Sequence, residues 1–265
     1  MTPFWRKAPA RRPRIGYALS GGAVRGAAHL GFLAVFEQAG IRPDVIAGTS
    51  AGAVVGAGYA AGLSVEQMYE MAKAATWREV TGTPRLRALS VFATTPLREW
   101  LGGAMGDVAF DDLEIPFAAV ACNAIDGTVV VLRSGPLVEA AVASCAIPGL
   151  FAPLERDEML LVDGGVVDNL PVDVARTLGA DVVIAVDVSP LREPRRPENL
   201  RDMMANTVSI MARGKQVESR SQADFLVLPR TEDFSPWDFA RIEEIIDSGR
   251  EAALTVVPEV LALLG

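Results

Sequence analysis

The sequence predicts an α/β fold of three layers, in which helices cover both faces of a mostly parallel central sheet. Short runs of β-branched and apolar residues alternate along the chain with longer stretches whose apolar residues recur at helical spacing. The chain has 265 residues, of which 50% are hydrophobic. A chain of this length and composition can bury a substantial core, so we expect a globular protein.

The expected elements follow from this alternation. Runs with the length and composition of strands are residues 15–20, 44–48, 116–123, 128–133, 159–162, 181–187 and 225–228. Stretches with helical periodicity are residues 25–38, 51–60, 65–75, 137–146, 171–178, 200–218 and 239–264.

Residues 81–106 fit the alternation least. They combine prolines and glycines with scattered apolar residues such as Leu86, Leu97 and Trp100, and we expect them to form a cap over the sheet. The apolar part of this segment is either a lid that admits lipid chains or a simple packing flap. Residues 15–265 are expected to form a single domain.

The N-terminal residues 1–14 form a basic arm. They place Arg6, Lys7, Arg11, Arg12 and Arg14 beside Phe4 and Trp5. Such an arm is either a solvated tail or a segment that rests on an anionic membrane surface. The net charge of −8 argues against nucleic acid as a partner, because phosphate binding needs a basic face.

The apolar runs and the numbers of cysteine and histidine residues limit which cellular locations and metal sites are expected. No apolar stretch approaches the roughly 18 residues of a membrane span, and the basic N-terminus lacks a signal-peptide core, so we expect a cytoplasmic protein, with peripheral membrane contact as the alternative. Cys122, Cys145 and the single histidine, His29, are too few for a disulfide scaffold or a zinc site. Both thiols are expected to be buried, and no metal or cofactor is expected.

The stretch GTSAG at residues 48–52 places Ser50 between two glycines. The expected strand 44–48 runs into it and the expected helix 51–60 leaves it, which is the arrangement of a nucleophile elbow. The N-terminus of that helix would stabilise negative charge that develops beside the serine. The motif alone occurs often by chance in a chain rich in glycine and alanine, so its context carries the prediction.

The stretch GGAVRG at residues 21–26 forms a glycine-rich turn after the first expected strand. Backbone N–H groups in such a turn can hold a phosphate or an oxyanion. A dinucleotide site would need an acidic residue where the second strand ends, but the elbow serine occupies that place, and there is no G-K-[ST] sequence for a P-loop. A nucleophile facing an oxyanion hole is therefore the simpler interpretation.

A serine nucleophile needs a base, and His29 is poorly placed to be one. It lies in the helix that leaves the glycine-rich turn, about 6 Å of axial rise beyond Arg25, and so runs away from the strand ends. We expect it to be a helix residue with satisfied hydrogen bonds rather than a member of a triad.

Carboxylates at strand ends are the other candidates for the base. They are Asp126, Asp163 and Asp187, and each could instead be a hydrogen-bonded turn aspartate. Asp163 is followed by Gly164 and Gly165, which would let another part of the backbone approach closely.

With these motifs in order, the sequence resembles the patatin-like phospholipase family. The resemblance rests on GGAVRG, GTSAG, DGG at residues 163–165, and the stretch SCAIPGLFAPLERDEMLLVDGG before and through the third motif. It runs from about Ile15 to Val188. It implies a Ser/Asp dyad without histidine, with Ser50 as the nucleophile and Asp163 as the base.

The resemblance also assigns the glycine-rich turn. It implies an oxyanion hole of backbone N–H groups around Gly21, Gly22 and Ala23, with Arg25 supporting the loop. The family usually has glycine where this chain has Ala23, and an alanine at positive φ would cost on the order of 1 kcal/mol. The further motif positions are Gly26, Gly48, Gly52, Gly164 and Gly165.

We therefore expect a serine acyl hydrolase that cleaves lipid or phospholipid carboxylic esters through an acyl-enzyme, without a cofactor. A thioesterase or acyltransferase with the same dyad is an alternative, as is a catalytically silent, lipid-binding regulatory module. A serine protease fits less well, because no extended polar binding feature is visible. The motifs carry no signal for oligomeric state.

Overall fold

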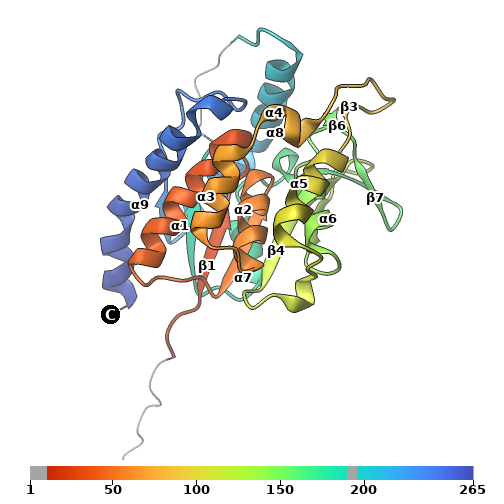
Figure 1. Ribbon diagram of the computed structural model, residues 1–265. Coiled ribbons are helices and arrows are strands. Elements are labelled where there is room, and N and C mark those ends of the chain that lie inside the picture. The colour runs from red at the N-terminus through yellow and green to blue at the C-terminus, as the bar shows by residue number, and fades with distance from the viewer. Residues whose placement is uncertain (1–10, 190–195, 265) are drawn as a thin grey trace, which may run out of the picture.

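The computed structural model describes residues 11–189 and 196–264. Its centre is a twisted sheet covered by helices on both faces (Figure 1). The strands of the sheet are β1 (Ile15–Leu19), β2 (Val45–Thr49), β4 (Phe117–Asn123), β5 (Val129–Leu132), β7 (Leu154–Arg156), β8 (Met159–Asp163), β9 (Val182–Val186) and β10 (Phe225–Val227).

The sheet is parallel through most of its width. The order is β10-β9-β1-β2-β4-β8-β7, with β5 also pairing with β4. Neighbouring strands from β10 to β4 are parallel, whereas β5, β7 and β8 run antiparallel to their partners. The predicted three-layer fold with a mostly parallel sheet is confirmed.

The helices lie in two layers around this sheet. Their bounds are α1 (Ala28–Gln38), α2 (Ala51–Ala60), α3 (Val65–Ala74), α4 (Trp77–Thr81), α5 (Thr95–Met105), α6 (Leu137–Ser144), α7 (Val172–Thr177), α8 (Leu200–Gln222) and α9 (Ile242–Leu264). Short 3-10 turns occupy Ala23–Ala27, Phe110–Asp112, Gly164–Val166 and Phe239–Arg241. Helices α1, α2, α6 and α9 pack on one face, and α7 packs on the other with α8 beside it.

Strand β1 shows why both faces need a helical layer. Its side chains alternate, with Tyr17 in the core beneath α1 and Ala18 in the smaller core beneath α7. Tyr17 meets Phe32 and Phe36 of α1 edge-on, with ring centroids 4.9 and 6.0 Å apart. Since all residues of β1 and β2 are buried, the sheet forms a rigid platform beneath the loops at its edge.

Each strand and helix expected from the sequence is present, with ends that differ by a few residues. Strands β3 (Ser90–Phe92) and β6 (Gly149–Phe151), which form a separate parallel pair, were not predicted, and neither were β7, α4 and α5. Strands β3, β6 and β7 have three residues each and, unlike β10, do not lie in a continuous apolar run, and α4 and α5 lie in or next to the proline-containing stretch expected to be a cap.

Part of the N-terminal arm is described. Residues 1–10 lie outside the described residues, but Arg11 pairs with Asp181 at 3.0 Å and Arg12 with Asp44 at 2.8 Å. These contacts fasten the end of the arm beside the start of β1. Among the described residues, no helix has the length and apolar character needed to cross a bilayer.

Candidate active site

Ser50 occupies a sharp turn between β2 and α2. Its φ of 52° and ψ of −122° are sparsely populated by residues other than glycine. The turn is tight because a Cβ atom at Gly48 would collide with the backbone of Gly52, and one at Gly52 with the carbonyl oxygen of Leu19. The glycines of GTSAG are thus required by the space around the serine, as in a nucleophile elbow.

The register of β4 brings Asp163 to this turn. Thr49, the last residue of β2, pairs with Val120, and Asp163, the last residue of β8, pairs with the next residue of β4, Ala121. Strands β2 and β8 therefore end beside adjacent residues of β4. Ser50 Oγ donates a hydrogen bond to Asp163 Oδ2 at 2.6 Å.

The Asp163 side chain is buried from solvent. It is 3% exposed, and its Oδ1 accepts the N–H of Gly165 at 2.7 Å. Burial raises the pKa of Asp163 to about 6, against the opposing effect of the hydrogen bonds from Ser50 and Gly165. Gly164 lies directly against the carbonyl of Val120, where a Cβ atom would not fit.

Ser144, at the end of α6, fixes the backbone of the elbow. The N–H of Ser50 donates to Ser144 Oγ at 2.8 Å, and that hydroxyl donates in turn to the carbonyl of Val120 at 2.5 Å. Ser144 was not among the residues expected in the site from the sequence. It is the first residue of the SCAIPG stretch on which the resemblance partly rested, and that position was the available signal.

The glycine-rich loop lies against the elbow. A Cβ atom at Gly21 would come within 3.0 Å of Ser50 Cβ, and one at Gly26 would collide with Ala51 Cβ. Gly21 N–H donates to the carbonyl of Asn169 at 3.1 Å. Within the described residues, no hydrogen bond engages the backbone N–H of Gly22, so it is available to an anion.

Ala23 departs from ordinary backbone geometry. Its φ is +51°, in the left-handed region that favours glycine, so the loop carries the backbone strain expected for an L-residue at this position. Its N–H has no acceptor among the described residues either. Arg25 is buried and its Nε donates to the carbonyl of Gly22 at 3.4 Å, which supports the loop from behind.

The other candidate bases lie elsewhere. His29 is buried, and since a carbonyl can only accept, its Nε2–H donates to the carbonyl of Ser20 at 2.9 Å. Burial lowers the pKa of His29 to about 4. Asp126 accepts from Thr128 in an exposed turn, and Asp187 bonds to α8. Asp163 is the strand-end carboxylate that reaches the elbow.

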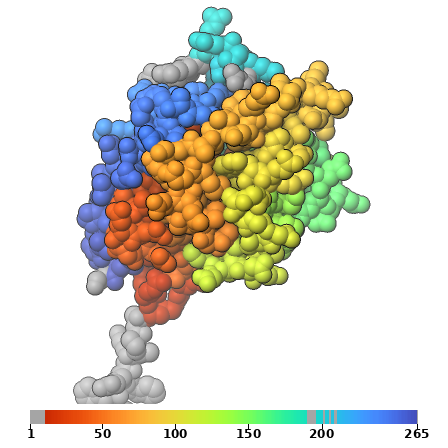
Figure 2. All heavy atoms as spheres, viewed as in Figure 1, coloured from red at the N-terminus to blue at the C-terminus, as the bar shows by residue number. Residues whose placement is uncertain are grey.

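An apolar cavity of about 190 Å³ opens beside Ser50. Its wall is apolar and comes from α2, α3, α5 and the segment around Trp237. The segments that include α3 and α5 adjoin on the surface over this region, in orange and yellow in Figure 2. Helix α5, from the stretch expected to be a cap, contributes Leu97, Trp100, Leu101 and Met105, whereas Leu86 in the same stretch is 87% exposed.

Cys145 also borders the cavity. It is half-buried, and burial raises the pKa of its thiol. Cys122 is buried in β4. Of the two thiols expected to be buried, one is therefore fully covered and the other partly so.

The structure is thus a three-layer α/β protein in which a serine at a strand–helix turn lies against a glycine-rich loop and contacts a buried aspartate. Residues 17–176 match the family described as patatin-like phospholipase. Because this match spans more than half of the chain, the protein belongs to the patatin-like phospholipase family.

Curated relatives agree with this assignment. An uncharacterized NTE family protein of Mycobacterium bovis is 37% identical over 179 residues, which are 67% of this chain and 49% of the relative. Lysophospholipase nte1 of Emericella nidulans is 32% identical over 75% of this chain and 13% of its own length. The chain thus spans about half, or much less, of the relatives that it matches.

The similarity to a solved structure concerns the fold. VipD from Legionella pneumophila is 13% identical, with a TM-score of 0.55 over 96% of this chain and 69% of that chain. The arrangement of layers is therefore shared with that protein, although few residues are.

Proposed function

We propose that this protein hydrolyses lipid carboxylic esters with Ser50 as nucleophile and Asp163 as general base. The single observation that carries the proposal is the 2.6 Å hydrogen bond from Ser50 Oγ to a buried carboxylate oxygen at a strained elbow. Family membership and the name of the lysophospholipase relative support the same chemistry.

The acylation step uses the dyad directly. Ser50 Oγ attacks the ester carbonyl while its proton moves to Asp163 Oδ2, and Asp163 passes that proton to the leaving alcohol as the tetrahedral intermediate collapses. A carboxylate with a pKa of about 6 is ionised at pH 7, yet it is a stronger base than an ordinary aspartate. Water then attacks the acyl-enzyme with Asp163 again acting as the base.

The glycine-rich loop is proposed to stabilise the oxyanion. The N–H groups of Gly22 and Ala23 have no acceptors among the described residues, Ala23 lines the cavity, and Gly21 lies against Ser50. Helix α2 begins immediately after Ser50, so its N-terminal dipole favours the same negative charge.

The cavity indicates the substrate class. A wall of apolar side chains next to the nucleophile would bind an acyl chain by burying it from water. We propose that α5, within the cap segment 81–106, forms one side of this acyl site. The alcohol or head group would lie toward the open side of the elbow.

The test compares p-nitrophenyl esters of increasing chain length with Ser50→Ala, Asp163→Asn and the control Asp126→Asn. The control changes another strand-end carboxylate that is exposed and does not contact Ser50. We expect activity to rise with chain length, to fall at least about a thousandfold in the two dyad variants, and to persist in the control.

Labelling identifies the nucleophile independently. An alkyl phosphonate probe should modify Ser50, as located by peptide mass spectrometry, and leave Ser50→Ala unmodified. Inactivity of the folded wild type on oxygen esters and thioesters, together with no labelling of Ser50, would contradict the proposal and favour a lipid-binding module.

A further inference from the structure

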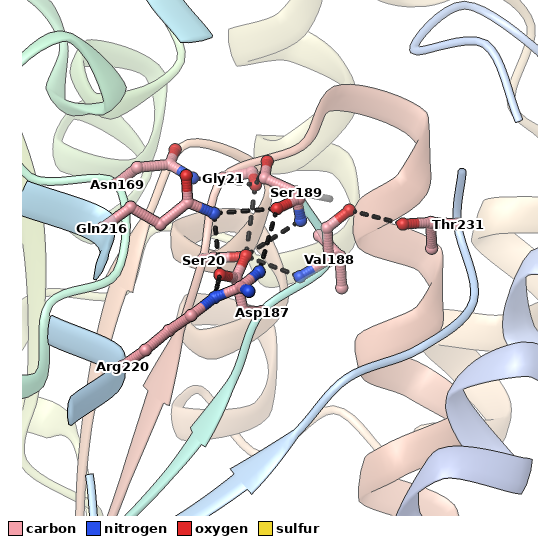
Figure 3. Close-up of polar contacts among 9 residues, drawn as sticks. All are labelled: Ser20, Gly21, Asn169, Asp187, Val188, Ser189, Gln216, Arg220 and Thr231. Atoms are coloured by element: carbon pink, nitrogen blue, oxygen red, sulfur yellow. Dashed lines mark hydrogen bonds and ion pairs between the residues drawn. The ribbon is translucent and has the colours of Figure 1, made fainter. Parts of the chain in front are cut away.

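A buried polar network connects α8 with the glycine-rich loop (Figure 3). Its centre is Asp187, which follows β9 and has a fully buried side chain. Asp187 Oδ2 accepts two donors from α8, Arg220 Nε and Gln216 Nε2, each at 2.7 Å. These residues lie beyond the part of the chain that matches the family, which ends at residue 176.

The network fixes Ser189 through both of its backbone polar groups. Its N–H donates to Asp187 Oδ1 at 2.9 Å. Its carbonyl oxygen accepts from Gln216 Nε2 at 2.8 Å and from Arg220 Nη2 at 3.4 Å. Helix α8 therefore determines where the Ser189 side chain lies. Charged hydrogen bonds in a buried site hold geometry firmly, because breaking one leaves an unpaired charge out of water.

The Ser189 side chain reaches the glycine-rich loop. Its Oγ donates to the carbonyl oxygen of Gly21 at 2.7 Å. The same oxygen also receives Ser20 Oγ at 3.2 Å and Asn169 Nδ2 at 3.5 Å, so Ser189 provides the shortest of these contacts. The Ser20 hydroxyl is itself held by the N–H of Val188 at 2.9 Å.

Holding this carbonyl has a direct consequence for Gly22. The Gly21 carbonyl and the Gly22 N–H belong to one planar trans peptide group, so they point in opposite directions. A peptide between two glycines can rotate at little steric cost, and without a clamp its N–H would sample many directions. Fixing the carbonyl oxygen on the α8 side directs the Gly22 N–H toward the other side of the loop.

We propose that Ser189, held by Asp187, Gln216 and Arg220, is a positioning residue that orients the Gly22 N–H in the oxyanion hole. None of the four side chains touches the reacting atoms. They act through the Gly21–Gly22 peptide, so α8 contributes to catalysis from the far layer of the sheet. The proposal rests on the proposed function of the glycine-rich loop.

The experiment uses the full chain and four variants. Ser189→Ala removes the hydroxyl, Ser189→Thr retains one, and Arg220→Gln weakens the hold on Asp187. The matched control is Arg176→Gln, which disrupts a 2.6 Å ion pair with Asp224 at the β10 edge of the same sheet. Thermal unfolding of each variant shows whether it is folded.

Two measurements are made on each folded variant. Hydrogen exchange followed by mass spectrometry reports the mobility of peptides that cover residues 20–27. Ester hydrolysis gives kcat and KM separately. A residue that orients an oxyanion donor acts in the transition state. Loss of this orientation therefore lowers kcat and leaves KM unchanged, whereas general loosening of the fold would change both kcat and KM.

In Ser189→Ala and Arg220→Gln we expect faster exchange in this loop and a kcat lowered about tenfold at constant KM. Ser189→Thr and Arg176→Gln should retain wild-type values of both. Unchanged exchange in the loop of Ser189→Ala, or an unchanged kcat in an active enzyme, would overturn the proposal. If the wild type proves inactive, the proposed function fails separately, and the exchange data still decide whether the network orders the loop.

Discussion

Ser50 Oγ and Asp163 Oδ2 are 2.6 Å apart although 113 residues separate them in the chain. Strand β4 makes this possible, because β2 and β8 pair with it from opposite directions and end at its adjacent residues Val120 and Ala121. The geometry of the proposed dyad therefore depends on strand register. A slip of either strand by one residue would turn its side chains to the other face of the sheet.

The pH dependence of hydrolysis should follow the ionisation of Asp163. The base must be ionised to accept the serine proton, and its pKa is raised to about 6 by burial. We expect kcat/KM to increase about tenfold per pH unit below pH 6 and to level off above about pH 7. Initial rates with a soluble short-chain ester between pH 4.5 and 9 measure this. A profile that stays flat through pH 5 would count against Asp163 as the base.

The same pKa predicts how stability depends on pH. The folded-state pKa of Asp163 lies above its ordinary value of 3.8, so between about pH 4 and 6 the folded protein binds a proton that the unfolded chain releases. This contribution to the free energy of unfolding is present below pH 4 and lost as the pH rises through 6. Asp163→Asn removes the titration and should be more stable than the wild type near pH 7.

Urea unfolding at pH 4.5 and at pH 7 checks this linkage. We expect the stability difference between Asp163→Asn and the wild type to grow by on the order of 2 kcal/mol between these conditions. His29 acts in the opposite direction, since its pKa is lowered to about 4 and its contribution is lost as the pH falls, but it is common to both proteins and cancels. A pH-independent difference would show that Asp163 titrates normally.

Ala23→Gly should relieve backbone strain in the glycine-rich loop. Alanine at φ +51° costs about 1–2 kcal/mol, which glycine would relieve. The greater freedom of glycine in the unfolded chain lowers the free energy of unfolding by about 0.4–1 kcal/mol and so offsets part of this gain. We expect the free energy of unfolding to rise by about 0.5 kcal/mol, with hydrolysis retained, as measured by chemical denaturation.

Ala28→Gly is the matched control for this change. Ala28 has an ordinary φ of −61° at the start of α1, so glycine there relieves no strain, and it brings both the entropic cost and the loss of a buried methyl group. This variant should lose about 1 kcal/mol or more. Equal destabilisation of both variants would mean that Ala23 is not strained.

Filling the apolar cavity should shorten the preferred acyl chain. Ala72 of α3 lines the cavity, and Ala72→Phe would occupy space that a long chain needs. We expect kcat/KM for a p-nitrophenyl laurate to fall about tenfold or more, with p-nitrophenyl butyrate little affected. Ala74→Phe places the same side chain on an exposed position of the same helix and should leave both substrates unchanged. Parallel losses on the two esters in Ala72→Phe would place the acyl chain elsewhere.

The elements that the sequence predicted well are those with a strong local signal. The buried parallel strands β1, β2 and β9 are continuous, mostly apolar runs, and the elbow is marked by a short motif of fixed spacing. The short strands β3 and β6 lack such a signal, because they are defined by pairing with each other across the 56 residues from 93 to 148. Their existence depends on how distant segments pack.

The candidate site divides in the same way. Ser50, Asp163 and the glycine-rich loop could be selected from the order and spacing of motifs, and the resemblance assigned their roles. Ser144 could not, because its importance lies in a hydrogen bond to the backbone of Ser50 from another helix. The positive φ of Ala23 was foreseen only as a possibility of the glycine-rich turn.

By itself the sequence determined the layered fold, the family and the candidate residues of the site, because these depend on local patterning and short motifs. Only the tertiary structure decided that Asp163 meets Ser50, that Asp187 turns instead toward Arg220, and that Ser189 reaches Gly21. Those relationships depend on strand register and helix docking, which are set by the packing of the whole core and leave no trace in any short stretch of sequence.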